Sequence, residues 1–392
     1  MTQIGKKIIV IGAGIGGLAV ARALALRGAD VTVLEQAEAI TEVGAGLQIS
    51  PNGFAVLRAL GLGEALVSDA VQGQAVSLRD YRRGEVLRLD LTLLESRDYY
   101  FVHRADLIDL LADGARSAGV KIRLLQKVEK VKPGERPSIV LANGAEIEAD
   151  LIIGADGLHS KVRQALNGTL APFFTRQAAW RAVVPNDTAR GPEVQVHMGP
   201  LRHVVSYPIR GGRFLNIVAV QERAAWASES WSQEDDPLVL QSAFSDFSED
   251  VQTILSKVEK VHLWGLFRHP VAEIWQGGGT VILGDAAHPT LPFLAQGASM
   301  ALEDGWVLAD ALSDADDMKQ ALQNYQARRQ ARVTRVISAA NGNARKYHLS
   351  FPPLRWVTQS ALRLGGAFAP MRMMRQFDWL YGHDVTENNQ LH

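Results

Sequence analysis

The stretch KIIVIGAGIGG, residues 7–17, decides the fold. Its branched apolar residues follow one another without polar alternation, which predicts a buried parallel strand. In the turn that follows, Gly12 permits the tight bend, Gly14 lets the backbone approach a pyrophosphate, and Gly17 lets a helix pack closely on the strand. The free N–H groups and the positive dipole end of that helix face the same point. The stretch therefore predicts the start of a dinucleotide-binding βαβ unit.

A carboxylate completes this unit. Glu35 follows the second expected strand, residues 31–34, and lies 18 residues after Gly17, close to the roughly 20 that the ribose-binding acid needs. A carboxylate there accepts hydrogen bonds from ribose hydroxyls and repels a 2′-phosphate, so the tightly held nucleotide should not be NADP. The alternative, a glycine-rich turn without a ligand, accounts for the turn but leaves Glu35 unexplained.

Two further motifs follow buried strands, at the sheet edge where ligands bind. The first is GADGLHSKVR, residues 154–163, in which Asp156 is either a ligand-binding residue or a simple helix cap. The second is GDAAHP, residues 284–289, where Asp285 can hold a polyol hydroxyl while His288 can equally be a loop histidine. The segment PFLAQGA, residues 292–298, then opens a helix that can present N–H groups to an electron-rich ring edge.

Composition excludes several classes of protein. The net charge of -1 gives no broad attraction to nucleic acid or to an anionic membrane. The absence of cysteine excludes disulfides, thiolate metal sites and thioether attachment of a cofactor, and we expect a cytoplasmic protein without a bound metal. The apolar run at residues 8–26 imitates a signal peptide or a membrane span, but its glycines and central arginine fit strand, turn and helix better.

With 392 residues the chain should form two or three units. We expect a discontinuous nucleotide-binding domain made of residues 1–75, 103–170 and 271–345. A mostly antiparallel β-sheet, residues 76–102 and 171–270, is inserted in it, because strand-like runs and aromatic residues replace helix signals there. Residues 318–348 should form one long helix, and residues 346–392 a C-terminal helical segment.

Taken together, these motifs resemble those of the class A FAD-dependent aromatic hydroxylases, in particular the salicylate hydroxylase and hydroxynicotinate monooxygenase branch. Further matches are GAGLQISPN at residues 44–52, HRADL at 103–107, Tyr207-Pro208, and WLYGHD at 379–384. The resemblance spans nearly the whole chain. It implies an α/β fold, with a Rossmann-like FAD-binding domain, an inserted antiparallel substrate domain and C-terminal helices.

The resemblance also implies an activity and a cofactor. FAD, which we expect to be non-covalent because there is no cysteine for thioether attachment, is reduced by transient NADH or NADPH. Oxygen then forms a flavin hydroperoxide that hydroxylates a small aromatic substrate, either a phenolic or a hydroxylated heteroaromatic acid. In this family Glu35 would hold the adenosine ribose, Arg104 the pyrophosphate region, and Asp285 the ribityl chain. Asp156 would touch FAD and the passing NAD(P)H, and residues 292–298, which include Gly297 and Ala298, would line the flavin ring.

The substrate contacts are expected on the inserted sheet. His203 and Tyr207 are four residues apart on one strand, so both face the same way, and some relatives carry a His and a Tyr beside the substrate hydroxyl. Alternatively, Tyr207 packs behind the site and His203 faces solvent. Pro292 borders the pocket. Gln48 stands where a relative carries a catalytic histidine, which argues against a base on that loop, and Phe293 stands where relatives carry a polar residue or a histidine, which predicts a more apolar pocket. Trp180 fits the core better than the substrate wall.

Other functions stay open at this point. The same fold supports epoxidation or another oxygenation, and a non-catalytic flavin-binding redox sensor would need the same cofactor motifs. A flavin halogenase lacks support because AWRAVVP, residues 179–185, does not match the WxWxIP signature. The expected partners are a small aromatic substrate, O2 and NAD(P)H, without nucleic acid or membrane; a homodimer is left open.

Overall fold

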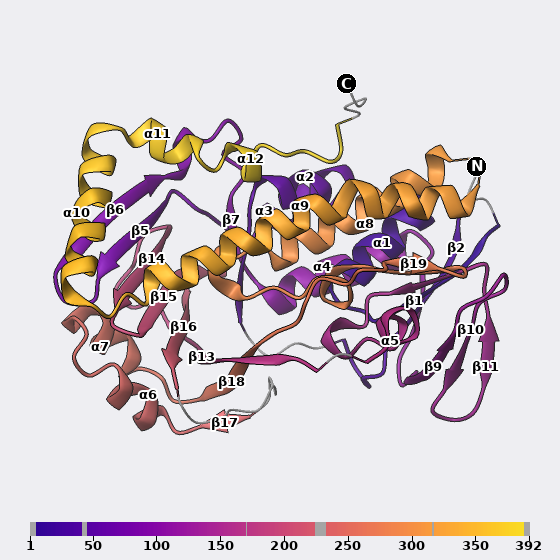
Figure 1. Ribbon diagram of the computed structural model, residues 1–392, viewed down its shortest axis with the longest axis horizontal. Helices are drawn as coiled ribbons and strands as arrows, with labels where there is room; N and C mark the ends of the chain where they lie inside the picture. Colours follow the sequence, from indigo (N-terminus) through magenta and orange to yellow (C-terminus); the bar gives the residue numbers. More distant parts are fainter. Residues whose placement is uncertain (1–4, 41–44, 170, 224–232, 316, 388–392) are drawn as a thin grey trace.

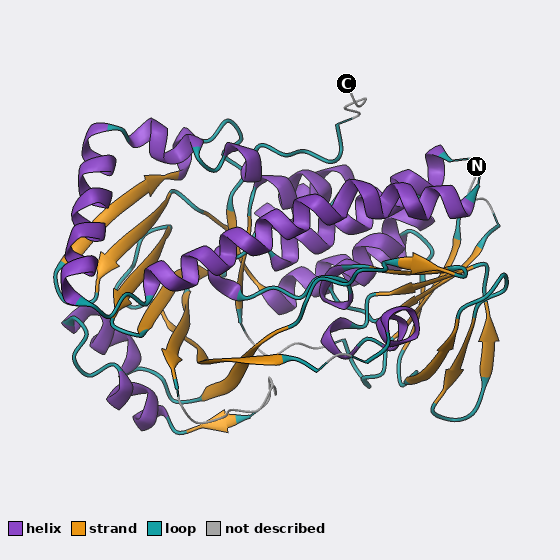
Figure 2. Ribbon diagram, viewed as in Figure 1, coloured by secondary structure: helices purple, strands orange, loops and turns teal. Residues whose placement is uncertain are grey.

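The computed structural model describes residues 5–40, 45–169, 171–223, 233–315 and 317–387. Two sheets lie at opposite ends of the molecule, and the long helix α9 (Met318–Tyr347) runs from one towards the other (Figures 1 and 2). Helix α12 (Asp378–Tyr381) contacts α2 (Pro51–Ala59). The expected α/β architecture with an antiparallel sheet and C-terminal helices is confirmed.

The first sheet is the predicted Rossmann-like sheet, with strand order β19-β20-β12-β1-β2-β8. The central strand β1 pairs in parallel with β2 and with β12, placing Ile9 between Thr32 and Ile152. Its members are β1 (Lys7–Ile11), β2 (Asp30–Leu34), β8 (Lys121–Arg123), β12 (Leu151–Gly154), β19 (Gln276–Gly277) and β20 (Thr280–Ile282). Because β1, β12 and β20 are parallel, the three motifs that follow them meet at one edge.

Helices cover this sheet. The apolar run that could imitate a membrane span forms β1 and then α1 (Ile15–Ala25), which is buried along nearly its whole length. Helix α1 packs against α4 (Arg104–Ser117) and α8 (Gly297–Asp314). Gly305 permits the close approach of α8, because a Cβ there would lie 3.0 Å from the backbone nitrogen of Val20.

The second sheet has eight strands, ordered β17-β18-β13-β16-β15-β14-β5-β6. All neighbours pair antiparallel except β14 and β5, which are parallel. The strands are β5 (Ala75–Asp80), β6 (Gly84–Asp90), β13 (Phe173–Pro185), β14 (Glu193–Gly199), β15 (Arg202–Ile209), β16 (Phe214–Glu222), β17 (Glu234–Asp235) and β18 (Val261–Arg268). This sheet confirms the expected antiparallel insertion.

Two short helices in this region were not foreseen. Helix α6 (Pro237–Ala243) starts where the Asp236 carboxylate accepts the backbone N–H of Leu238, and α7 (Glu249–Leu255) follows it. Their apolar side chains join the cluster that encloses Trp180, which is fully buried and donates its indole N–H to Asp235 at 2.7 Å. Trp180 is therefore a core residue, as the sequence favoured.

Smaller elements connect the two sheets. Strand β7 (Tyr100–His103) pairs with β3 (Gly46–Ile49) and β4 (Val71–Gln72), so residues 100–102 leave the eight-stranded sheet that residues 76–102 were expected to join. The remaining elements are α3 (Gly63–Val67), α5 (Lys161–Asn167), and a three-stranded sheet of β9 (Val128–Lys132), β10 (Ser138–Leu141) and β11 (Glu146–Glu148). The division into domains stays a prediction.

The chain continues after α9 into α10 (Pro352–Phe368), α11 (Pro370–Arg375) and α12. Helices α10 and α11 pack beside β6 of the eight-stranded sheet (Figure 1). Among the described residues, none of the helices combines the length and the apolarity that a membrane span requires.

Candidate active site

One cleft of about 840 Å³ runs from the glycine turn after β1 to the face of the eight-stranded sheet. It brings together thirteen of the fourteen residues that the sequence predicted to contact cofactor or substrate. The candidates for cofactor binding among them are Gly12, Gly14, Glu35, Arg104, Asp156, Asp285, Gly297 and Ala298, and the candidates for substrate contact are Gln48, His203, Tyr207, Pro292 and Phe293. Gly17 lies behind the cleft wall, where the first helix meets the turn.

The glycines of the turn have different tasks. Gly12 has a φ of +102°, and a Cβ there would lie 2.4 Å from the carbonyl oxygen of Ala155. A Cβ on Gly17 would lie 2.1 Å from the carbonyl oxygen of Gly12, so the bend itself needs both glycines. By contrast, a Cβ on Gly14 would meet nothing within 4 Å, and Gly14 lines the cleft. Gly14 therefore leaves room for a ligand rather than for the protein.

Glu35 lies beside this turn. Its carboxylate accepts the backbone N–H of Ala13 at 2.9 Å and that of Ala37 at 2.9 Å. These bonds fix the carboxylate at the end of β2, on the cleft wall. A carboxylate has roughly four lone-pair sites, so acceptor capacity remains for hydroxyl groups of a ligand.

Two aspartates and an arginine line the middle of the cleft. Desolvation raises the pKa of Asp285, while the neighbouring His288 and Arg104 lower it by smaller amounts. The Oδ2 atom of Asp156 accepts the backbone N–H of Lys161 at 2.7 Å, and its Oδ1 atom is buried without a hydrogen-bond partner among the described residues. Burial raises the pKa of Asp156. Both carboxylates can accept hydrogen bonds from a polar ligand.

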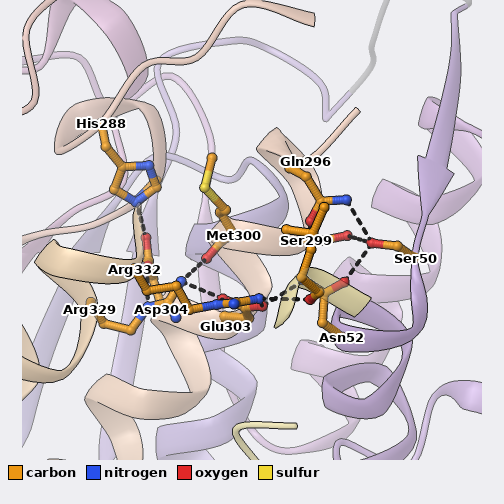
Figure 3. A network of polar contacts seen from close by, with 12 residues as sticks. Ser50, Asn52, His288, Gln296, Ser299, Met300, Glu303, Asp304, Arg329 and Arg332 are labelled. Atoms are coloured by element: carbon orange, nitrogen blue, oxygen red, sulfur yellow. Dashed lines mark hydrogen bonds and ion pairs between the residues drawn. The ribbon is translucent and has the colours of Figure 1, made fainter. Parts of the chain in front are cut away.

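The first turn of α8 closes the cleft at its far end. Ala295 adopts the left-handed conformation with φ of +52°, which ends the short 3-10 turn Pro292–Leu294 and lets α8 start at Gly297. Behind this start, Gln296 donates to Ser50 at 2.9 Å and accepts from Asn52 at 3.2 Å (Figure 3). The helix start is therefore fixed from behind by buried polar side chains of α2 and the residue before it.

A buried ionic cluster joins α8 to α9 (Figure 3). Arg329 of α9 pairs with Glu303 at 2.6 Å and with Asp304 at 2.7 Å, and all three side chains are at most 1% exposed. Desolvation opposes ionisation of Glu303, but Arg329 and Arg332 outweigh it and lower its pKa to about 2. Asp304 also binds the His288 ring. His288 is thus a buried structural residue, and the cluster stiffens the cleft wall instead of lining it.

At the sheet end of the cleft, His203 and Tyr207 of β15 face the same side, as the strand period requires. The Gln48 side chain lies between two phenols: its Oε1 atom accepts from Tyr99 at 2.8 Å, and it also hydrogen-bonds Tyr207. Burial raises the pKa of Tyr207, and the nearby Arg181 guanidinium and Gln48 lower it by smaller amounts. Tyr207 therefore stays protonated at neutral pH and can donate a hydrogen bond.

His203 is buried, with 2% of its surface exposed. Its ring packs beside Phe293 and Tyr347, with ring centroids 5.7 and 5.4 Å away. Its Nδ1 atom lies 2.6 Å from Nε2 of His348, which follows α9. Burial first, and His348 second, lower the pKa of His203 well below its usual value of about 6.5. His203 is thus a neutral imidazole that can act as a base.

A second cavity of about 190 Å³ adjoins the cleft. The two share Gln48, His203, Val205, Pro292, Phe293 and Ala295. The rest of its wall is mostly apolar and comes from the sheet, from the end of α9 and from α10 to α12. The cavity is large enough for a single aromatic ring, and most of the surface that lines it is apolar.

Comparison with known proteins agrees with this geometry. A family model described as "FAD binding domain" matches residues 6–340. The 3-amino-4-hydroxybenzoate 2-monooxygenase of Streptomyces cremeus is 36% identical over 390 residues, which cover 96% of this chain and 95% of the relative. The chain belongs to the class A FAD-dependent monooxygenases.

Two further matches place this flavoprotein monooxygenase within that class. The 6-hydroxynicotinate 3-monooxygenase of Pseudomonas fluorescens is 32% identical, covering 86% of this chain and 91% of the relative. The crystal structure of HpxO from Klebsiella pneumoniae, complexed with FAD and uric acid, superimposes with a TM-score of 0.84 at 25% identity, covering 95% of this chain and 96% of that chain. The branch that the sequence motifs indicated is thereby confirmed.

FAD fits the residues of the cleft in this flavoprotein. The cleft is long, Gly14 opens space at the start of α1, and a buried carboxylate oxygen of Asp156 lacks a partner among the described residues. One matched motif is only partly described, because Gly44 of the stretch at residues 44–52 lies outside the described residues.

The sequence did not reveal every residue at the site. Arg181 lines the cleft beside Tyr207, with its guanidinium 4.1 Å from the ring centroid of Trp264. The alternation of β13 could have indicated it, because Trp180 faces the core and its neighbour must face the other side. His348 gave no such signal, since it reaches His203 only through the packing of α9 on the sheet.

Proposed function

We propose that this monooxygenase hydroxylates a small aromatic acid that carries a ring hydroxyl, using NADH or NADPH and O2. One observation supports this most strongly: a single cleft joins the glycine turn after β1 to His203 and Tyr207. The relatives named above act on 3-amino-4-hydroxybenzoate and on 6-hydroxynicotinate, which are both small aromatic acids with a hydroxyl group. The adjoining cavity of about 190 Å³ suits a ring of that size.

The cofactor roles are part of this proposal. Glu35 holds the adenosine ribose, Arg104 the pyrophosphate region, and Asp285 the ribityl chain, while Asp156 contacts both FAD and the passing NAD(P)H. The N–H groups at the start of α8, at Gly297 and Ala298, would hold the flavin ring when FAD is bound. Bound non-covalently, FAD supplies hydride acceptance and oxygen activation. The protein contributes binding, orientation and exclusion of water.

The substrate end prepares the ring for attack by an electrophilic oxygen. A phenolate is far more electron-rich than a phenol, so removing the hydroxyl proton speeds the reaction. Neutral His203 accepts this proton, and the Tyr207 hydroxyl donates a hydrogen bond to the resulting oxyanion. Arg181, which already lowers the pKa of Tyr207, stabilises negative charge at the same end. Phe293 and Pro292 form an apolar wall that keeps water away.

A substrate screen tests the proposal. The FAD-loaded protein is mixed with NADH or NADPH and with 3-amino-4-hydroxybenzoate, 3-hydroxybenzoate, salicylate or 6-hydroxynicotinate; benzoate, which lacks the hydroxyl, is the control. We expect at least one hydroxy acid to stimulate NAD(P)H oxidation and to yield a product that carries one atom from 18O2. If benzoate performs as well as every hydroxy acid, or if no compound is oxygenated, the proposal is wrong.

Epoxidation and a non-catalytic redox sensor are weaker candidates. The same screen separates them, since an epoxidase would oxygenate non-aromatic alkenes and a sensor would oxidise NAD(P)H without an oxygenated product. Hydroxylation has more support, because a neutral histidine and a tyrosine that line the cleft can bind and deprotonate a hydroxyl group, which the substrate of an epoxidase does not need.

We also propose that the protein forms a homodimer. Helix α10 exposes several large apolar side chains, among them Trp356, Leu364 and Phe368, which are 63%, 59% and 84% exposed. Monomeric proteins seldom expose contiguous apolar patches of this kind. Sedimentation of the wild type and of a Phe368→Glu variant tests the proposal. A wild type that sediments as a monomer at micromolar concentration would contradict it.

A further inference from the structure

A chain of three side chains connects the buried pocket with the protein surface. The Nδ1 atom of His203 lies 2.6 Å from Nε2 of His348, and Nδ1 of His348 lies 2.9 Å from Oε1 of Glu222. His203 and His348 are only 2% and 4% exposed, whereas the Glu222 side chain is 38% exposed. The chain thus begins at the cleft wall and ends at water.

Elementary hydrogen bonding fixes the protons along this chain. A Glu222 carboxylate can only accept, so His348 carries its proton on Nδ1. With this single proton on His348, its Nε2 atom is an acceptor, which places the proton of His203 on Nδ1. The Nε2 atom of His203 is left as a lone pair, and it has no hydrogen-bond partner among the residues that the structure describes. That lone pair is free to accept a proton inside the cleft.

His203 is badly suited to keep a proton that it accepts. Its ring is enclosed by Phe293, Tyr347 and His348, and burial lowers its pKa well below 6.5. A phenol has a pKa of about 10. The equilibrium for moving its proton to His203 therefore favours the phenol by a factor of more than about 10³. A base of this kind is effective only when the proton moves on. Gln177, which lies 3.3 Å from Nδ1 of His348, cannot take it, because an amide does not titrate.

We propose that Glu222 and His348 form the exit path for the proton of the substrate hydroxyl. The O–H bond of the substrate breaks and its proton joins Nε2 of His203, whose Nδ1 proton moves to Nε2 of His348. The Nδ1 proton of His348 then moves to the Glu222 carboxylate, which releases it to water. One proton enters, one leaves, and the negative charge stays on the substrate oxygen. The inference rests on the proposed function, because it needs a hydroxylated substrate.

The test follows the proton without turnover. The oxidised, FAD-loaded full-length protein is mixed with 3-amino-4-hydroxybenzoate in weak buffer without NAD(P)H, and stopped-flow absorbance records phenolate formation and proton release to a pH indicator. In Glu222→Gln the amide can still accept from His348 but cannot take a proton. We expect at least a 10-fold slower proton release in Glu222→Gln and in His348→Phe, in line with the ~10²–10⁴-fold effects of acid–base groups. Glu222→Asp, which keeps a carboxylate, should release the proton within about 3-fold of the wild-type rate, by the same scale.

Glu193→Gln is the matched control. Glu193 is a partly exposed carboxylate of the same sheet. It pairs with Arg88 at 2.6 Å and takes no part in the hydrogen bonds between His203, His348 and Glu222. Circular dichroism and FAD affinity establish that each variant is folded, and His348→Gln replaces His348→Phe if the latter fails to fold. If the wild type forms a phenolate while Glu222→Gln and the His348 variant release the proton at the wild-type rate, the exit path is wrong. If the wild type neither forms a phenolate nor hydroxylates any acid in the screen, the proposed function itself fails.

Discussion

The two ends of the cleft are built in different ways. At the FAD end, a single stretch of eleven residues, 7–17, supplies strand, turn and helix start, and its effect depends on backbone geometry. At the substrate end, the side chains come from distant parts of the chain: Gln48 of β3, His203 of β15, Phe293 before α8, and His348 after α9. The FAD end should therefore tolerate almost no change of backbone conformation. The substrate end should tolerate substitutions of side chains, which change its chemistry.

This difference explains why one fold serves many substrates. At the FAD end the ligand does not change with the substrate, so one arrangement of N–H groups and carboxylates can serve for any substrate. The substrate end binds by side chains, which can be exchanged without moving the sheet. Mutations at the two ends should therefore have different effects. At the FAD end they should reduce FAD binding and stability, and at the substrate end they should uncouple NAD(P)H oxidation from hydroxylation.

The largest effect is expected at Gly12. In Gly12→Ala the new Cβ would clash with Ala155 at 2.4 Å, and a φ of +102° is strained for alanine. Backbone strain and overpacking together should cost about 3 kcal/mol or more in the free energy of unfolding. FAD binding should be lost or nearly so. Chemical denaturation and flavin fluorescence measure the two effects.

Gly14→Ala is the matched control for Gly12. Its Cβ meets nothing within 4 Å and its φ is ordinary for alanine, so we expect a change of less than about 1 kcal/mol in stability. FAD affinity should nevertheless fall, because the methyl group occupies space in the cleft. Equal destabilisation in both variants would show that the turn glycines do not divide their tasks as described.

The next effect concerns the substrate end. In Tyr207→Phe and His203→Ala, FAD should still bind and NAD(P)H should still be oxidised, but hydroxylation should slow by about 10²-fold or more when the base is lost. The decisive quantity is the ratio of product to NAD(P)H consumed, with the remainder released as hydrogen peroxide. Tyr100→Phe, whose hydroxyl bonds to Asp98 outside the cleft, is the control. If both variants keep the wild-type ratio and hydroxylation rate, the base lies elsewhere.

The same difference decided what could be predicted from the sequence. The parallel sheet and the FAD end were predictable, because residues 12–17 and Glu35 act within one local unit. The strand spacing of His203 and Tyr207 also predicted a shared face correctly. In contrast, the contact of His203 with His348 joins residues 145 positions apart, and no local pattern marks it.

Two other features were missed for related reasons. The cluster of Glu303, Asp304 and Arg329 looks like ordinary helix-surface charge in the sequence, and it is buried only because α8 and α9 face each other there. Strand β7 reads like a continuation of the inserted sheet, but it pairs with β3 on the way back to α4. Both outcomes depend on tertiary packing, which overrides local patterns.

A smaller effect is expected at Asp285. Asp285→Ala should weaken FAD binding by about 10- to 150-fold, the loss that follows removal of a hydrogen bond with one charged partner, roughly 1.5–3 kcal/mol. Stability without FAD should change little or rise, because the carboxylate is held in a desolvated place where its pKa is raised. Titration with FAD measures the affinity. Asp113→Ala, at a side chain that is 78% exposed on α4, is the control. Unchanged affinity would make Asp285 a turn residue.

The smallest effect concerns pH and stability at the substrate end. Burial and His348 lower the pKa of His203 in the folded state well below the unfolded value of about 6.5. A lowered folded pKa means that the unfolded chain binds the proton more readily, so this contribution to stability is present above pH 6.5 and is lost as the pH falls below it. Between pH 8 and pH 5.5 the loss for one such histidine is about 1.4 kcal/mol.

In His203→Gln, the free energy of unfolding should therefore fall by about 1.4 kcal/mol less than in the wild type over this range, as urea denaturation at each pH would show. Because both proteins share all other titrating groups, the difference between them isolates His203. Parallel curves for the two proteins would mean that His203 is protonated as easily in the folded chain as in the unfolded one, and it could then not be the neutral base at the substrate end.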